Sequence, residues 1–248
     1  MTYFRIKFCK MNIALAGYGK MGHEVEAVAR ERGHQIALII DIDNIDRLNP
    51  GALAGIDVVI EFTVPGAAPE IISSMLKASI PVVSGTTGWL SRYDEISALV
   101  VEHQTAFIHS SNFSPGVYMV SRLNSMLASY MLLVPGYKAS IEEIHHTAKI
   151  DSPSGTAIML SDQIVSNNDS YSGWTGIPVD NPELISIKSV REGKVPGTHH
   201  IKWTSEIDSI TLSHEAYSRK GFALGAVMSA EYIAGRKGIF RMEDIFGF

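Results

Sequence analysis

The segment Glu143 to Ala157, which reads EIHHTAKIDSPSGTA, holds the densest group of reactive side chains in the chain. His145 can exchange a proton near neutral pH, and Lys149 can supply a positive charge or a proton. His145 and His146 point to opposite faces if the strand that carries them persists, so both reach one ligand only if the chain turns there. The segment predicts acid–base catalysis, with His145 and Lys149 as the catalytic residues.

The end of this segment predicts an anion site made of backbone. Ser152 and Pro153 fit the N-cap and the first residue of a helix. The amides of Ser154, Gly155 and Thr156 would then be free donors at a helix N-terminus, where Gly155 leaves room for a carboxylate. We therefore expect these three residues to bind a carboxylate of the substrate.

Two less specific interpretations of the histidine pair are surface polarity and a metal site. A metal is disfavoured because no third His or Cys stands at a suitable spacing, so no metal ligand is predicted. His199, His200 and His214 are expected to be structural or solvent-facing, because no charged residues cluster near them in the sequence.

A glycine-rich loop, Gly17-Tyr18-Gly19-Lys20-Met21-Gly22, follows one apolar run and opens a stretch of helical periodicity. In a dinucleotide-binding loop, Gly17 permits the tight turn, Gly19 admits the pyrophosphate and Gly22 allows close packing. The helix N-terminus would face the phosphates. This context predicts a nicotinamide cofactor, and the alternative is a glycine turn that binds nothing.

The choice of cofactor depends on Asp41, which ends the second predicted strand 24 positions after Gly17. A carboxylate there would bind the ribose 2'-hydroxyl and repel a 2'-phosphate. Lys20 could still attract that phosphate. Either NADH or NADPH is therefore expected, with NADH favoured.

Two further loops follow the fourth and fifth predicted strands. They are Gly85-Thr86-Thr87-Gly88 and the run from Ser110 through Ser111 and Asn112 to Phe113. Ligands of open α/β sheets bind beyond the carboxyl ends of the strands, so both loops are expected to contact the cofactor. Phe113 could cover the nicotinamide ring, although each loop could also be a simple turn.

The elements that would position these residues alternate in the first half of the chain. Apolar runs at 13–16, 36–40, 58–60, 81–83 and 106–108 predict strands, and helical periodicity separates them. Such alternation predicts a Rossmann-type parallel sheet covered on both faces.

The pattern changes after Pro115. A helix at 117–130 precedes strands of period two, in which Ala139, Ile141, Glu143 and His145 share one face. We expect an α+β substrate and oligomerisation domain with a mixed, mostly antiparallel sheet, and a long loop at 166–182. An apolar helix at 222–234 should return to the first domain.

The predicted organisation is a dinucleotide-binding domain at 11–114 and 217–248, a substrate domain at 115–216 and an N-terminal extension at 1–10. Met11 is interpreted as the natural start, with an extra edge strand at 3–8 as the alternative.

Composition excludes several classes of protein. The 248 residues are 46% hydrophobic and 19% charged with a formal net charge of −5, so nucleic acid is not expected as a partner. No apolar run is long enough to span a membrane, and no membrane partner is expected. The single cysteine, Cys9, fits a reducing cytoplasm.

Several motifs in this order resemble the dihydrodipicolinate reductase (4-hydroxy-tetrahydrodipicolinate reductase) family of bacterial lysine and diaminopimelate synthesis. The resemblance covers nearly the whole chain from Met11. Its motifs are the segment 143–157, EFTVP at 61–65, GTTGW at 85–89, NFS at 112–114, SVREG at 189–193 with GTH at 197–199, and FALGA at 222–226.

The resemblance implies a role for each site residue. His145 would be the general acid/base and Lys149 the proton donor, while His146, Gly155 and Thr156 would bind a substrate dicarboxylate. The segments 17–22, 85–87 and 110–113, with Asp41, would bind the cofactor. The family reduces a cyclic unsaturated imine dicarboxylate and is usually a homotetramer joined through the second-domain sheets.

Departures from the family lie at the adenosine end of the cofactor. The glycine loop is one residue shorter than in the best-known members, the stretch 41–57 is shortened, and Lys20 stands where many members have Arg. The competing functions are another two-domain Rossmann reductase, a degenerate member that binds without turnover, and a non-catalytic NADH sensor, which would need a DNA-binding element that the sequence lacks.

Overall fold

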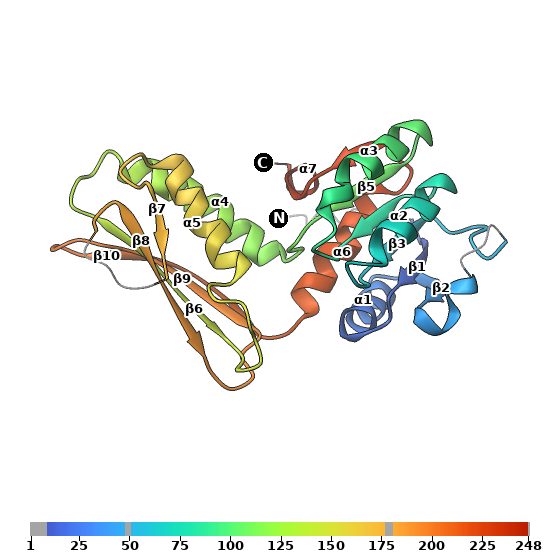
Figure 1. The fold of residues 1–248 in the computed structure, drawn as a ribbon, viewed down its shortest axis with the longest axis horizontal. Helices are drawn as coiled ribbons and strands as arrows, with labels where there is room; N and C mark the ends of the chain where they lie inside the picture. The colour runs from blue at the N-terminus through green and yellow to red at the C-terminus, as the bar shows by residue number, and fades with distance from the viewer. Residues whose placement is uncertain (1–8, 48–50, 177–180, 248) are drawn as a thin grey trace, which may run out of the picture. The chain divides into compact units, whose positions relative to one another are not determined.

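The computed structural model describes residues 9–47, 51–176 and 181–247, and it divides into two compact units. The chain up to Ser114, together with Lys220 onward, forms unit 1, and Pro115–Arg219 forms unit 2 (Figure 1). The edge strand considered at 3–8 lies outside the described residues.

Unit 1 contains a six-stranded sheet in the order β11-β5-β4-β3-β1-β2, and every neighbouring pair is parallel. Its strands are β1 (Asn12–Ala16), β2 (Gln35–Ile40), β3 (Val58–Glu61), β4 (Val82–Ser84), β5 (Ala106–His109) and β11 (Gly238–Phe240). The predicted Rossmann-type sheet is confirmed. The short strand β11 was not predicted, because its three residues show no apolar periodicity.

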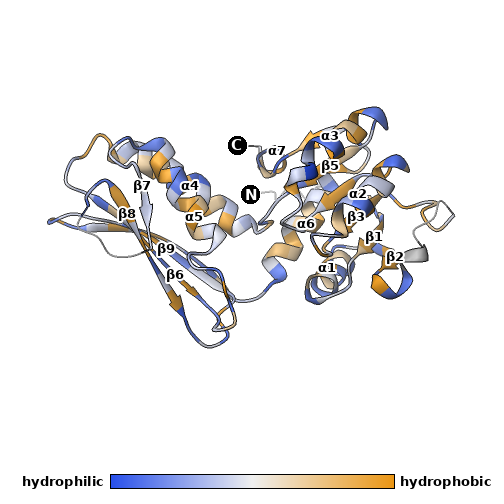
Figure 2. Ribbon diagram, viewed as in Figure 1, coloured by the Kyte–Doolittle hydropathy of each residue, from blue (hydrophilic) through white to orange (hydrophobic). Residues whose placement is uncertain are grey.

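Helices complete unit 1: α1 packs with α6, and α2 packs with α3. The helices are α1 (Lys20–Glu31), α2 (Ala68–Lys77), α3 (Tyr93–Glu102), α6 (Lys220–Ile233) and α7 (Met242–Phe246), with 3-10 turns η1 (Ile42–Arg47) and η2 (Leu90–Arg92). Apolar colour is continuous along the central strands in Figure 2, as expected for a parallel sheet buried on both sides. No helix within the described ranges is long and apolar enough to cross a membrane.

Unit 2 contains a five-stranded sheet in the order β10-β9-β6-β8-β7. Its elements are α4 (Pro115–Met131), β6 (Lys138–His145), α5 (Gly155–Asn167), β7 (Gly173–Thr175), β8 (Leu184–Arg191), β9 (Gly197–Thr204) and β10 (Ser209–Ala216). The prediction of a mixed, mostly antiparallel sheet is confirmed, since the two antiparallel pairings of β9, with β6 and with β10, are longer than the parallel pairings of β8 with β6 and β7. β6 and β7 run in the same direction because α5 carries the chain over the sheet between them.

One face of this second sheet is covered by α4 and α5, which lie side by side. Ala139, Ile141, Glu143 and His145 of β6 are all buried on that face. The predicted loop at 166–182 differs from the structure, since α5 continues to Asn167 and β7 forms within it. β7 was missed because its three half-buried residues do not alternate in polarity.

Candidate active site

Glu143 and His145 lie two residues apart on the buried face of β6, which places their side chains next to each other. The Glu143 Oε2 and His145 Nδ1 atoms are 3.0 Å apart. The other oxygen, Oε1, accepts from the Ser154 amide (3.0 Å), the Ser189 hydroxyl (2.7 Å) and the Arg191 guanidinium (3.1 Å). The carboxylate thus connects three separate segments of unit 2.

Glu143 is ionised despite its complete burial. Burial alone would raise the pKa of this carboxyl, but the contacts from His145, Ser154, Ser189 and Arg191 outweigh it and hold the pKa far below the usual range. A fixed negative charge therefore stands beside the His145 ring.

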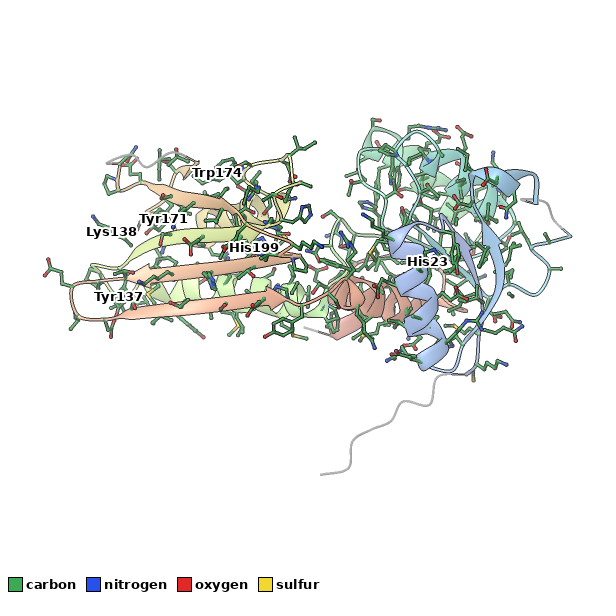
Figure 3. The ribbon with its side chains drawn as sticks, turned by 90° about the horizontal axis from the view of Figure 1, so that it is seen from below. His23, Tyr137, Lys138, Tyr171, Trp174 and His199 are labelled. Atoms are coloured by element: carbon green, nitrogen blue, oxygen red, sulfur yellow. The ribbon has the colours of Figure 1, made fainter. Side chains whose placement is uncertain are left out.

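His199 of β9 is paired across the sheet with Glu143, and Figure 3 shows it at the opposite end of the sheet from Tyr137 and Lys138. Its Nε2 lies 4.0 Å from Glu143 Oε2 and 3.2 Å from the Ser154 hydroxyl. Its ring centroid is 5.2 Å from that of His145. Burial, helped by the charge of His145, lowers the pKa of His199 to about 3, so this ring is neutral.

His199 was expected to be structural or solvent-facing, and its burial excludes the solvent-facing alternative; the expectation that no charged group lies near it is wrong. Its side chain is buried, and the charged partners come from β6 rather than from its own sequence neighbourhood. The argument that no third histidine could join a metal site fails for the same reason.

Glu143, His145 and His199 offer ligand atoms within 4.8 Å of one another. Their geometry does not fit a metal ion well. Ligand atoms at about 2.0–2.1 Å from tetrahedral zinc are separated by about 3.3 Å, and Glu143 Oε2 is already only 3.0 Å from His145 Nδ1. The second oxygen of Glu143 is engaged by a cation, Arg191. The cluster fits a direct carboxylate–imidazole contact better.

The start of α5 differs from the prediction. Ser154, not Ser152, is the N-cap, and its hydroxyl accepts from the Ala157 amide at 3.2 Å. Pro153 precedes the cap in a cis peptide bond. Because the Ser154 amide donates to Glu143, it is not available to a ligand. Gly155 and Thr156 open the helix, and nothing lies within 4 Å of where a Cβ of Gly155 would be.

The loop after β6 carries His146 and Lys149. The His146 amide donates to the Val195 carbonyl at 2.8 Å, which ties the loop to the β8–β9 connection. Lys149 Nζ is 2.8 Å from Asp151 Oδ1. Arg191 donates to the Asp151 carbonyl at 2.6 Å, so the guanidinium that binds Glu143 also holds this loop.

In unit 1, the glycine loop has the geometry of a phosphate site. Gly17 has a φ of +86°, and a Cβ there would lie 2.1 Å from the Phe62 carbonyl oxygen. A Cβ on Gly22 would lie 2.5 Å from the Gly17 oxygen. Gly19 is the N-cap of α1 and makes no side-chain cap hydrogen bond. This open helix N-terminus, approached closely by backbone, fits a pyrophosphate.

The other residues of the loop are less uniform. Lys20 and Met21 begin α1, and Lys20 is exposed. Tyr18 turns onto its own helix, where its hydroxyl donates to Glu26 and its ring centroid is 4.1 Å from that of His23.

Asp41 follows β2 directly and is half-buried. Its Oδ1 accepts from the Ile42 amide at 2.9 Å, and its own amide donates to Asn44 at 2.7 Å. The carboxylate is therefore held at the carboxyl edge of the sheet, where a ribose binds in this fold.

Glu61, the buried last residue of β3, joins two loops at that edge. Its Oε1 accepts from the Thr63 amide (2.7 Å), the Thr63 hydroxyl (2.5 Å) and the Thr86 hydroxyl (2.5 Å). Its Oε2 accepts from the Ser84 hydroxyl at 2.7 Å. The Thr86 side chain is thus engaged by Glu61 and holds its own loop in place. Beside it, Gly85 is half-buried and Thr87 is exposed.

The loop after β5 is folded on itself. The Ser110 hydroxyl donates to the Asn112 carbonyl at 2.8 Å, and Ser111 is exposed. Phe113 is 2% exposed and packs edge-on against Phe62, so its ring is buried within unit 1, and its position over a nicotinamide ring stays a prediction. Gly225 of α6 explains part of this burial, since a Cβ there would lie 1.6 Å from the Phe113 oxygen.

The sequence reasoning named no role for Glu143, Ser189, Arg191, His199 or Glu61. A usable signal existed for two of them. Glu143 shares the buried face of its strand with Ile141, and His199 shares one with Ile201 and Trp203. A polar side chain on an otherwise apolar, buried strand face needs a hydrogen-bond or ion-pair partner. Both positions therefore indicated a buried polar contact.

Two family models match the chain, and the boundary between them lies where the chain first passes from unit 1 to unit 2. "Dihydrodipicolinate reductase, N-terminus" matches residues 11–113, and "Dihydrodipicolinate reductase, C-terminus" matches residues 116–246. The chain belongs to the dihydrodipicolinate reductase family. The resemblance found in the sequence is therefore confirmed.

Curated relatives from distant organisms carry the family name. A 4-hydroxy-tetrahydrodipicolinate reductase of Christiangramia forsetii is 47% identical over 235 residues, covering 95% of this chain and 97% of the relative. One from Clostridium novyi is 33% identical and covers 76% of each chain.

A solved structure has the same fold. The dipicolinate-bound dihydrodipicolinate reductase from Paenisporosarcina sp. TG-14 superposes with a TM-score of 0.77 at 23% identity, covering 94% of this chain and 98% of that one. The two-unit architecture described above is therefore that of the dihydrodipicolinate reductase fold.

Proposed function

We propose that this chain reduces 4-hydroxy-tetrahydrodipicolinate to tetrahydrodipicolinate in lysine and diaminopimelate synthesis, with His145 as general acid/base and Lys149 as proton donor. The observation that carries the proposal is the buried, ionised Glu143 held 3.0 Å from the His145 ring, in a chain of the dihydrodipicolinate reductase family. A proton-transfer group with a charged partner is what such a reduction needs.

Unit 2 supplies groups suited to a dicarboxylate. The first amides of α5, at Gly155 and Thr156, lie where the helix favours an anion. His146 and Lys149 stand in the loop that leads to them. One carboxylate would meet the helix start while His146 balances the other, which leaves His145 and Lys149 to supply the proton that accompanies the hydride, while the 4-hydroxyl group leaves as water. Dipicolinate, bound in the structure from Paenisporosarcina, is a flat dicarboxylate of this kind.

Unit 1 supplies the cofactor site of the proposal. A bound reduced nicotinamide would supply the hydride. The Gly17–Gly22 loop would receive its pyrophosphate, with segments 85–87 and 110–113 beside it. Asp41 would bind the ribose 2'-hydroxyl, and we therefore propose NADH as the preferred cofactor.

Asp41→Asn keeps an acceptor for the Ile42 amide but loses the charge, so it should raise the KM for NADH more than that for NADPH. Asp43→Asn, on the exposed next turn, is the control.

The proposal is tested by following the hydrogen atom that NADH transfers, rather than the loss of NADH absorbance. NADH carrying deuterium at C4 is incubated with the chain and freshly made product of dihydrodipicolinate synthase, and the product is examined by mass spectrometry. One deuterium in tetrahydrodipicolinate is the expected result. Cofactor binding without transfer would support a non-catalytic sensor, and transfer only to an unrelated carbonyl or imine would support another reductase.

A further inference from the structure

We infer that Glu143 is a positioning residue that fixes both halves of the unit 2 site with one carboxylate. Oε2 orients the imidazole of His145, and Oε1 anchors the N-terminus of α5 together with the loop that carries Lys149. The inference rests on the proposed function, in which His145 and the helix start act on the same substrate.

The first half of the argument is the His145 ring. Nδ1 is fully enclosed and, like Glu143 Oε2, makes no well-aligned hydrogen bond within the described chain. The two atoms stand 3.0 Å apart, so the carboxylate is the charged group that Nδ1 meets. Nε2 lies on the other side of the ring, 3.0 Å from where a Cβ of Gly197 would stand. A carboxylate beside Nδ1 favours a proton on that nitrogen and leaves Nε2 to exchange a proton with a substrate.

The second half is the α5 start. Oε1 accepts from the Ser154 amide, and Ser154 is the residue that caps α5. Arg191 donates to Oε1 and, through the same Nη2 atom, to the Asp151 carbonyl. The carboxylate therefore sets where the first amides of α5 stand relative to the His145 ring.

The charges around this carboxylate favour its role. Arg191 of β8 contributes a positive charge in direct contact with Oε1, and His199 of β9 is neutral. The remaining titratable groups near the cluster are Lys149 and Asp151 of the loop, which pair with each other, and His214 of β10, paired in register with His199. α5 contributes the Ser154 hydroxyl and no charge. Removing the Glu143 charge would leave Arg191 and a protonated His145 without a counter-ion.

Glu143→Gln is the decisive variant, because it keeps the shape of the side chain and removes the charge. The control is Glu206→Gln, which makes the same change of charge in the exposed turn between β9 and β10. Both proteins are compared with wild type by steady-state kinetics over a range of pH, and by nitrogen NMR of histidine-labelled protein without substrate.

We expect Glu143→Gln to lower kcat/KM about 10- to 100-fold, as for loss of part of an acid–base contribution. The ring nitrogens of neutral His145 should report a proton on Nδ1 in wild type and a mixture of the two tautomers in Glu143→Gln, because a carboxylate favours the proton on the nitrogen that faces it. Glu143→Asp, which retains the charge, should keep the proton on Nδ1 in part.

Other outcomes overturn the inference. A Glu143→Gln enzyme with reduced activity but an unchanged His145 tautomer would make Glu143 a structural residue only. Stoichiometric zinc in the purified wild type, with activity lost to a chelator, would make the cluster a metal site instead. The tautomer measurement needs no turnover, so it still decides the inference if wild type fails to reduce the substrate and the proposed function falls. If Glu143→Gln does not fold, the wild-type spectrum decides by itself, and a neutral His145 ring with its proton on Nε2 overturns the inference.

Discussion

His145 and Lys149 differ in how firmly the protein holds them. The His145 side chain is 9% exposed and is enclosed by Glu143, His199 and Gly197, whereas Lys149 is 21% exposed in a loop and contacts Asp151. The fixed imidazole of His145 suits an acid–base group that must present one nitrogen to the substrate. The longer, more accessible ammonium of Lys149 suits a proton donor that must reach a bound substrate.

His145→Gln and Lys149→Ala are each expected to lower kcat by roughly a hundredfold or more, the scale of losing an acid–base group. Because both residues belong to unit 2, the dissociation constant for NADH measured by fluorescence should stay within about twofold of wild type. His103→Gln, at the end of α3, serves as the control. Near-normal turnover in either variant would remove that residue from the mechanism.

His199 gives the fold a dependence on pH. Its pKa is lowered to about 3 in the folded chain, against about 6.5 when unfolded. The unfolded chain therefore binds the extra proton, and stability should fall as pH drops from about 6.5 towards 3, by at most about 1.4 kcal/mol per pH unit for this residue.

Replacing His199 by Gln should flatten that part of the curve. Denaturant unfolding at several pH values between 4 and 7 measures it, since the free energy of unfolding of wild type should fall more steeply than that of the variant. His103→Gln should retain the wild-type slope. Parallel curves for wild type and His199→Gln would mean that the ring is not held neutral.

At the scale of elements, two glycines of the loop that precedes α1 have different roles, one in the backbone turn and one in leaving space for a ligand. Gly17 has a positive φ and no space for a Cβ, whereas Gly19 has an ordinary φ of −78° and nothing within 4 Å of its would-be Cβ. The first glycine is thus required by the turn and the second only by whatever approaches the helix.

Gly17→Ala should therefore destabilise the protein by more than about 1 kcal/mol, because Ala is strained at that φ and meets the Phe62 carbonyl. Gly19→Ser should leave stability unchanged or slightly raised, because Ser is a good N-cap, while NADH binding weakens at least tenfold. Thermal unfolding and fluorescence titration measure the two effects. Normal NADH affinity in Gly19→Ser would place the pyrophosphate elsewhere.

Helices and strands with strong apolar periodicity were predicted well. Contacts between residues that are far apart in the sequence were not predicted. Parallel strands and amphipathic helices are local patterns, so the unit 1 sheet and the buried face of β6 could be predicted. Strand order is not local: His199 meets Glu143 only because β9 pairs with β6, and no spacing along the chain contains that fact. The α5 cap was misplaced by two residues because SPS offers two serines, and only the contact with Glu143 selects Ser154.

At the scale of the whole molecule, unit 2 leaves one face of its sheet uncovered by its own helices. That face includes Ser140, Glu142, Lys188, His200 and Lys202, which line a shallow hollow. We propose that copies of the chain join here as a homotetramer, in keeping with the family resemblance.

Light scattering after gel filtration should then give about 108 kDa, four times the 27.1 kDa of one chain. Ser140→Arg at the centre of this face should lower the mass, and Glu206→Arg in the β9–β10 turn should not. A 27 kDa wild-type species would contradict the proposal.

The most direct test of the central claim is wild-type turnover. The oxidation of NADH, and separately of NADPH, is followed by absorbance with freshly made dihydrodipicolinate synthase product as substrate. The account predicts oxidation that requires both the enzyme and the substrate, with the higher kcat/KM for NADH. No oxidation of either cofactor, by protein whose circular dichroism shows it to be folded, would contradict the assignment of this chain as a 4-hydroxy-tetrahydrodipicolinate reductase.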